Sequence, residues 1–237
     1  MNVGINFLPT DNLNLLIIKF LIFISIFLFV CNYFQIISFL KIFIGPKIKT
    51  EPLNDKWINS TVKKKTGLNL ITVTLFKDKK LYGMMAGLPF WPKMILSEGL
   101  YKTLNKEELE WVILHEAGHC ILWHNLEAAF FELGIEIVGI YTIALWNISL
   151  ILVPLYALLL SFICIQVIRW LIEYVADRFS IARVDNPQGV ISAQDKFRKC
   201  YKGSKFDGEH SLLRFLIHWN IYPEQRIKMA RERMASL

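Results

Sequence analysis

Hydrophobic residues in this chain gather in two long uncharged runs, and both runs predict membrane-spanning helices. The first, residues 20–40, lies between Lys19 and Lys41 and reads FLIFISIFLFVCNYFQIISFL. At about 1.5 Å of rise per residue it would form a helix of roughly 31 Å, the hydrocarbon thickness of a bilayer. A cleaved signal peptide would have a shorter apolar core and small residues at its cleavage site. The run therefore predicts an anchor that stays in the membrane.

The second run extends from Ile137 to Ile168 and contains no charged residue. It is too long for one ordinary span and too short for two, but an amphiphilic lead-in from Ala128 makes room for a tight helical hairpin. The turn is expected near Asn147-Ile148-Ser149. Pro154 follows the turn, where it would either open or kink the second helix. The chain would then cross the membrane about three times.

The net charge of +7 raises the question of nucleic-acid binding, but no nucleic-acid motif accompanies it. The basic residues lie almost wholly in 41–127 and 169–237, whereas the hairpin tip has none. The positive-inside rule places both polar regions on the cytoplasmic face of a cell (plasma or inner) membrane. The 4 cysteines are too scattered for a disulfide framework, so they are expected to be reduced.

The first polar region combines short strands with one long helix. Residues 68–76 and 93–97 are typical of strands, and 81–86 form a weaker third. A helix is expected to begin at Asn105, whose side chain can cap the first turn while Glu108 reaches back to form a capping box. Apolar residues at helical spacing extend this helix to about Glu127.

The motif His115-Glu116-Ala117-Gly118-His119 falls within this helix. Residues four apart lie on one helical face, so the two imidazoles can share a tetrahedral zinc ion, and the intervening glutamate points to the open coordination position. Zinc, one ion per chain, is the expected cofactor. Glu116 is the expected catalytic residue, acting as general base. The alternative is a pair of surface histidines on an ordinary helix.

A catalytic zinc site takes a third protein ligand, and Glu173 is the candidate. With Asp177 it forms an i, i+4 pair on a helix that follows the hairpin. Two membrane crossings return Glu173 to the side of His115 and His119, whereas a single crossing would separate them. The alternative for Glu173 is a membrane-proximal carboxylate paired with Arg169.

These motifs together resemble the M48 zinc metallopeptidases, which include the HtpX heat-shock proteases and the CAAX prenyl proteases. That family carries HExxH, a transmembrane hairpin and then an ExxxD helix, matched here by Glu173-Tyr174-Val175-Ala176-Asp177. The resemblance covers roughly residues 50–230. It implies that Asp177 orients a ligand imidazole by accepting its second N–H.

The sequence departs from the family in three places. HtpX-like members usually have two spans before the catalytic domain, and this chain has one. The family's Asn-Ala-aromatic substrate strand is absent near Tyr82-Gly83-Met84-Met85. Near the C-terminus, Tyr222-Pro223 and Arg226-Ile227 resemble a shortened His-Pro and Arg-Ile pattern, where Tyr222 or Arg226 has either an oxyanion-stabilising or a structural role.

The predicted fold is a mainly α membrane protein carrying a zincin-type catalytic domain, with the HExxH helix and a small edge sheet. Residues 1–44 form the N-terminal segment and anchor, and 128–170 the transmembrane hairpin. The catalytic domain is divided between 45–127 and 171–237, the second half carrying the ExxxD helix. A polypeptide substrate would pair with an edge strand, either near Met94-Ile95-Leu96 or near Gly83-Met84-Met85.

The predicted function is hydrolysis of peptide bonds by a membrane-bound zinc endopeptidase, acting on membrane or misfolded proteins at the cytoplasmic face. An intramembrane protease of the site-2 type is a poorer match, because the zinc helix opens with the charged segment Asn105–Glu110. A membrane sensor or regulatory protein that keeps a protease-like zinc site is the other alternative. A purely structural site would have no need of Glu116. The partners expected are a polypeptide and the lipid bilayer, with no nucleic acid.

Overall fold

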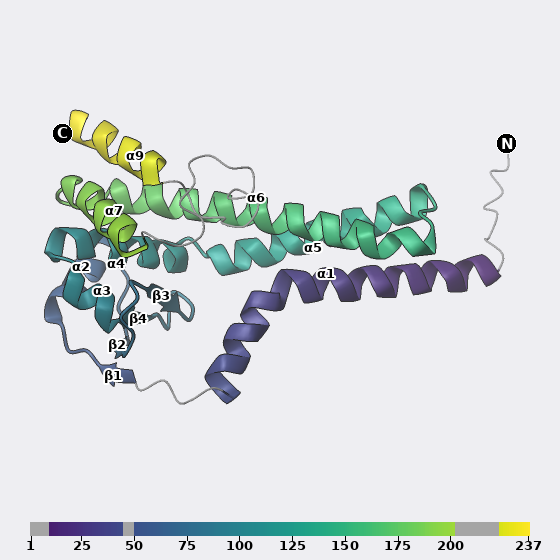
Figure 1. Ribbon diagram of the computed structural model, residues 1–237, viewed down its shortest axis with the longest axis horizontal. Helices are drawn as coiled ribbons and strands as arrows, with labels where there is room; N and C mark the ends of the chain where they lie inside the picture. Colours follow the sequence, from purple (N-terminus) through teal and green to yellow (C-terminus); the bar gives the residue numbers. More distant parts are fainter. Residues whose placement is uncertain (1–9, 45–49, 202–222) are drawn as a thin grey trace. The chain divides into compact units, whose positions relative to one another are not determined.

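The computed structural model describes residues 10–44, 50–201 and 223–237, and these are mostly helical (Figure 1). In chain order the elements are α1 (Thr10–Ile44), β1 (Thr50–Pro52), α2 (Lys56–Thr66), β2 (Thr72–Phe76), β3 (Gly83–Ala86), β4 (Lys93–Ser97), α3 (Glu98–Thr103), α4 (Lys106–Ile121), α5 (His124–Leu145), the 3-10 helix η1 (Leu150–Leu152), α6 (Val153–Ile181), α7 (Gln188–Tyr201) and α9 (Pro223–Ala235).

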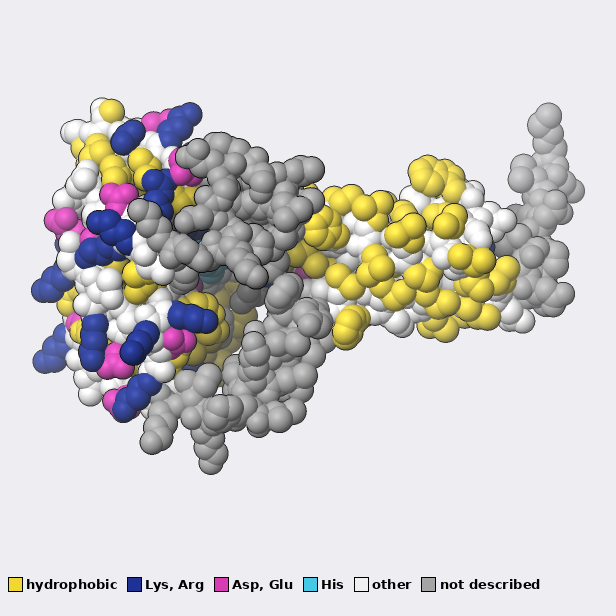
Figure 2. Space-filling view, viewed as in Figure 1, with side chains coloured by type: hydrophobic (Ala, Val, Ile, Leu, Met, Phe, Trp, Pro, Cys, Tyr) yellow, Lys and Arg dark blue, Asp and Glu magenta, His cyan; other side chains and the backbone are white. Residues whose placement is uncertain are grey.

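The chain divides into two compact units, and the polar and apolar residues divide with them. The helical unit contains residues 1–44 and 128–168, and the mixed unit contains 45–127 and 169–237. Among the described residues, three helices are long and apolar enough to cross a membrane, with candidate spans at Leu13–Cys31, Leu126–Leu145 and Leu150–Ile181. Figure 2 shows apolar side chains covering the helical unit and charged side chains gathered on the mixed unit. The prediction of about three transmembrane helices is confirmed.

The hairpin turn follows the end of α5 at Leu145 and includes Asn147, whose φ of 44° is left-handed. Asn tolerates this conformation better than most residues, since its short side chain can bond locally. Pro154 lies in the first turn of α6, where its missing N–H would have no intrahelical acceptor. Lys19 lies inside the first candidate span, 4% exposed, and donates to Asn147 Oδ1 at 2.9 Å. The sequence pattern alone indicates Lys19 only as the flank of an apolar run.

A four-stranded sheet in the order β1-β2-β4-β3 forms one layer of the mixed unit. β2 pairs parallel with β4, and β3 pairs antiparallel with the other side of β4. The strand at 93–97 is therefore internal, so the prediction that a peptide could pair near Met94-Ile95-Leu96 is wrong. β3 is an edge strand. β1, a three-residue strand that the sequence pattern did not reveal, pairs with β2 at the other edge.

Helix α4 packs through the middle of the mixed unit, and its N-terminus is closed by the predicted capping box. Asn105 Oδ1 accepts from the Glu108 amide at 2.9 Å, and Glu108 Oε2 accepts from the Asn105 amide at 2.8 Å. Glu108 is 1% exposed and also receives the Lys196 ammonium at 2.6 Å. A buried carboxylate needs such partners, since an unpaired one would be strongly destabilising. The cap thus joins α4 to α7 as well as ending the helix.

Replacing Asn105 by alanine is expected to destabilise the protein by about 1 kcal/mol, because it removes the acceptor for a free amide of the first turn. Unfolding in detergent micelles, followed by circular dichroism, measures this loss. Asn69→Ala is the matched control, since Asn69 is exposed before β2. Equal losses in the two variants would contradict a capping role for Asn105.

Candidate active site

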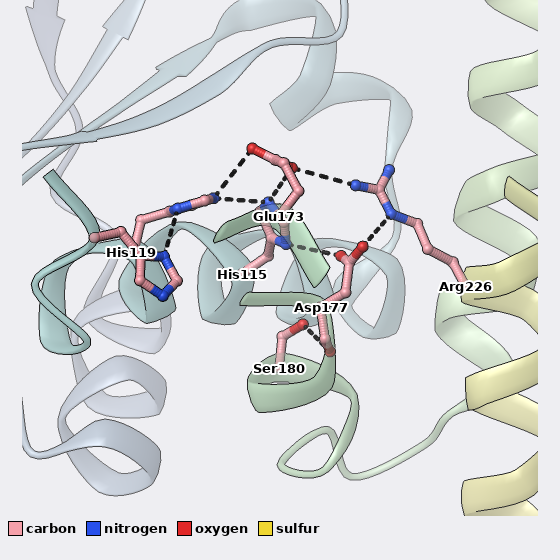
Figure 3. A network of polar contacts seen from close by, with 7 residues as sticks. His115, His119, Glu173, Asp177, Ser180 and Arg226 are labelled. Carbon is pink, nitrogen blue, oxygen red and sulfur yellow. Dashed lines mark hydrogen bonds and ion pairs between the residues drawn. The ribbon is translucent and has the colours of Figure 1, made fainter. Parts of the chain in front are cut away.

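Two helices bring the predicted metal ligands together within the mixed unit (Figure 3). Donor atoms of His115, His119 and Glu173 all lie within 4.8 Å of one another. The two Nε2 atoms are 3.2 Å apart, and the Glu173 carboxylate oxygens lie 3.4 Å from His115 Nε2 and 3.5 Å from His119 Nε2. Two imidazole nitrogens and one carboxylate oxygen are the donor set of many catalytic zinc sites. The residues therefore fit a zinc ion chemically.

The close approach of α4 and α6 depends on Gly118, inside the HExxH motif. A Cβ atom at this position would lie 3.1 Å from Phe179 Cδ1 and 3.6 Å from the Cα atom of Ala176. A larger residue would have to push Phe179 aside. Gly118 thus lets the backbone of the HExxH helix approach the helix that carries Glu173.

Asp177 and Arg226 form a charged layer behind the three donors. Asp177 is fully buried, and its Oδ1 lies 2.8 Å from His115 Nδ1. Arg226, from α9, donates through Nε to Asp177 Oδ2 at 2.6 Å and through Nη2 to Glu173 Oε2 at 3.5 Å. Its guanidinium therefore bridges the two carboxylates of the ExxxD helix, a contact that sequence spacing could not reveal. Tyr222, considered beside Arg226, lies outside the described residues.

Asp177→Asn is expected to raise the zinc dissociation constant about 10–100-fold, because a partner that orients a ligand imidazole contributes by about this much. The variant keeps the shape of the side chain and removes the charge next to His115. Competition with a chromophoric chelator measures the affinity. Asp195→Asn, exposed on α7, is the control. An affinity equal to that of the wild type would show that Asp177 does not act through His115.

The prediction of a continuous helix to about Glu127 is wrong, because the helix breaks after Ile121. The break changes the position of His124 relative to His119. α4 ends at Ile121, Trp123 has a left-handed φ of 56°, and α5 begins at His124. A regular helix would turn His124 away from His119. Instead, His124 is 2% exposed and its Nδ1 lies 3.0 Å from His119 Nδ1. His124 is not among the three clustered donors but supports one of them, leaving His119 Nε2 facing His115.

The electrostatic environment differs between the residues of the motif. Burial disfavours the charged form of His115, but the Asp177 and Glu173 carboxylates outweigh it and raise its pKa to about 10. Burial and the nearby charge of His115 lower the pKa of His119 to about 3, although the Glu173 carboxylate acts in the opposite direction. For Glu116, burial raises the pKa to about 7. A carboxylate with a pKa near neutrality is well matched to proton transfer at physiological pH.

Comparisons with known proteins show the family to which the chain belongs. The model of Peptidase family M48 matches residues 53–211, about two thirds of the chain, so the chain belongs to this family of zinc metallopeptidases. A crystal structure of S. mikatae Ste24p shares the fold, with a TM-score of 0.59 and 17% identity. The alignment covers 84% of this chain and 55% of that one, so the chain spans about half the length of that structure. A search of curated proteins gave no significant match.

Proposed function

We propose that this protein is a membrane-bound zinc endopeptidase, in which His115, His119 and Glu173 hold one zinc ion. The observation that carries the proposal is the convergence of their donor atoms within 4.8 Å. The two histidines lie on α4, before the apolar hairpin, and the glutamate lies on α6, after it.

Glu116 is the proposed general base and acid. Zinc held at the site would polarise the scissile carbonyl and make water more acidic. As the water oxygen bonds to the carbonyl carbon, Glu116 accepts a proton from that water. It delivers this proton to the amide nitrogen when the C–N bond breaks, so that a carboxyl group and an amine leave. Burial of Glu116 suits both steps, because it brings the pKa to about 7.

The substrate backbone is proposed to pair with β3, the edge strand nearest the proposed base. A Cβ atom on Gly83 would lie 3.6 Å from Glu116 Cγ, and the Met85 backbone favours the charged form of the Glu116 carboxyl, lowering its pKa. An extended peptide alongside β3 would therefore present its carbonyl groups close to Glu116. Backbone pairing requires no particular side chain, so the absent Asn-Ala-aromatic pattern is no obstacle.

The polar regions are proposed to face the cytoplasm of a cell membrane, where the enzyme would cleave membrane or misfolded proteins. Supporting this orientation, the segment from Ile137 to Ile168, which includes the hairpin turn, contains no Lys or Arg. Lys19 is the exception among the basic residues, and its ammonium donates one hydrogen bond to Asn147 Oδ1 at the turn, which leaves its charge in place.

The proposal is tested by comparing membranes from cells that express the wild type or Glu116→Gln. Peptide termini that appear only with the wild type, identified by mass spectrometry, would be products of cleavage. A sensor or regulatory protein would give identical termini in both samples. Cysteine labelling of the two polar regions in sealed vesicles tests the orientation separately, since labelling from opposite faces would contradict it.

A further inference from the structure

An exposed aromatic cluster lies on the mixed unit, formed by Leu88, Phe90, Trp91 and Trp123. Their side chains are 43%, 58%, 65% and 41% exposed, although large apolar side chains usually find burial. The Phe90 ring lies between the two indoles, with centroids 5.4 Å from Trp91 and 6.3 Å from Trp123. The three rings make one contiguous apolar surface, with Leu88 in the same turn as Phe90 and Trp91, and such surfaces commonly mark interaction sites.

Backbone hydrogen bonds fix the conformation of the turn that carries Leu88, Phe90 and Trp91. The Trp91 amide donates to the Leu88 carbonyl at 2.8 Å, closing a β-turn with Pro89 at its second position. Gly87 precedes it with φ of 90°, and a Cβ atom there would lie 2.1 Å from the Trp91 carbonyl oxygen. The Ile71 amide donates to the Pro92 carbonyl at 3.0 Å. The backbone thus holds Phe90 and Trp91 outward.

We propose that this cluster inserts into the interfacial layer of the same bilayer that the apolar helices cross. Trp123 lies three residues before Leu126, where a candidate span begins, so one cluster member sits where α5 enters the membrane. Trp is the side chain most favoured at this depth, since its ring is apolar and its N–H needs a polar partner.

The charges around the turn fit lipid headgroups. Residues 83–95 contain no Asp or Glu, and Lys93 lies two residues after the turn. A lysine beside inserted aromatic residues can reach phosphate groups with its ammonium while its stem stays near the surface. The turn therefore combines the apolar and basic features of a peripheral membrane contact.

This contact would position the edge strand as well as the domain. β3 ends at Ala86, and Gly87 starts the segment that leads into the turn. Insertion of Phe90 and Trp91 would hold β3 at the membrane surface, close to polypeptide segments that leave the bilayer. This consequence rests on the proposed function, whereas the membrane contact itself does not.

Nitroxide labels on the full-length protein in nanodiscs, one protein per disc, test the contact. The discs contain phosphatidylcholine and phosphatidylglycerol, and the background is Cys200→Ser, because Cys31, Cys120 and Cys164 are buried. Labels at Trp91→Cys, Leu155→Cys and Lys64→Cys are compared by their collisions with oxygen, which enters lipid, and with a nickel chelate, which stays in water. Leu155 is exposed within a candidate span, and Lys64 is exposed on α2.

The oxygen-to-nickel ratio at position 91 is expected to be several times that at position 64 and below that at position 155. A ratio equal to that at position 64 would overturn the proposal. Low collision rates with both reagents would also overturn it, since they would indicate a polypeptide or a second copy covering the cluster. A water-like ratio at position 155 would refute membrane insertion itself, while cleavage of a soluble peptide in detergent reports independently on the proposed peptidase.

A second label leaves the aromatic cluster intact. Lys93→Cys is exposed beside the turn, and its label is read with and without the double substitution Phe90→Ser and Trp91→Ser. The oxygen-to-nickel ratio is expected to fall several-fold in the double variant, because the turn would leave the interface. Leu237→Ser, far along the chain and 75% exposed, serves as the control. An unchanged ratio in the double variant would overturn the proposal.

Discussion

Glu116→Gln is expected to lower kcat for peptide cleavage about 10²–10⁴-fold, the contribution of a general acid–base group. Glutamine has nearly the same shape but cannot accept the proton of the attacking water. The three proposed zinc ligands are untouched, so zinc content should stay at one per chain. Cleavage of a quenched fluorescent peptide by purified protein gives kcat, and elemental mass spectrometry gives the zinc content.

The control for this prediction is Glu107→Gln, on the same helix but exposed. It should cleave at the wild-type rate. A Glu116→Gln protein with full activity would show that Glu116 has no part in the mechanism. An inactive variant that had also lost zinc would indicate that misfolding of α4 had disturbed the site. The thermal unfolding curve separates these two results.

Glu173→Gln is expected to raise the zinc dissociation constant by more than about 100-fold, beyond the loss typical of a partner outside the ligand set. The neutral amide oxygen is a weaker donor than the carboxylate, and it no longer balances the Arg226 guanidinium, which lies 3.5 Å from Glu173 Oε2. Dialysis against a graded series of zinc-chelator buffers measures the affinity. Cleavage should fall in proportion to the zinc lost.

Two outcomes would contradict the proposed role of Glu173. If Glu173→Gln bound zinc as tightly as the wild type, the third ligand would lie elsewhere. If the variant stayed inactive even at saturating zinc, Glu173 would do more than hold the ion. Glu232→Gln, exposed on α9, is the matched control and should bind zinc normally. The Glu116 and Glu173 variants therefore distinguish loss of chemistry from loss of metal.

Local features of the site could be predicted from the sequence because short-range geometry determines them. The i, i+4 spacing of His115 and His119 places both on one helical face, whatever surrounds the helix. The Asn105–Glu108 capping box depends only on residues three apart, and both of its hydrogen bonds are present. The lengths of the two apolar runs likewise predicted about three candidate spans.

Contacts between residues far apart in the sequence could not be predicted from spacing alone. The break at Trp123 depends on a single left-handed residue, and no turn-forming Gly or Pro announces it. Only this break brings His124 to within 3.0 Å of His119. The strand order was equally hidden, because alternation of apolar residues predicts a strand without its neighbours. The sheet therefore decided that β3, rather than the strand at 93–97, has a free edge.

The sequence by itself determined the chemistry: an HExxH helix, a downstream ExxxD pair and enough apolar length to cross a membrane. The tertiary structure alone decided which distant groups complete the site, above all Arg226, whose guanidinium contacts both Glu173 and Asp177 across some fifty residues of chain. The physical reason is the range of the interactions. Helical spacing and capping act within a turn or two, whereas ion pairs between helices depend on how the whole domain packs.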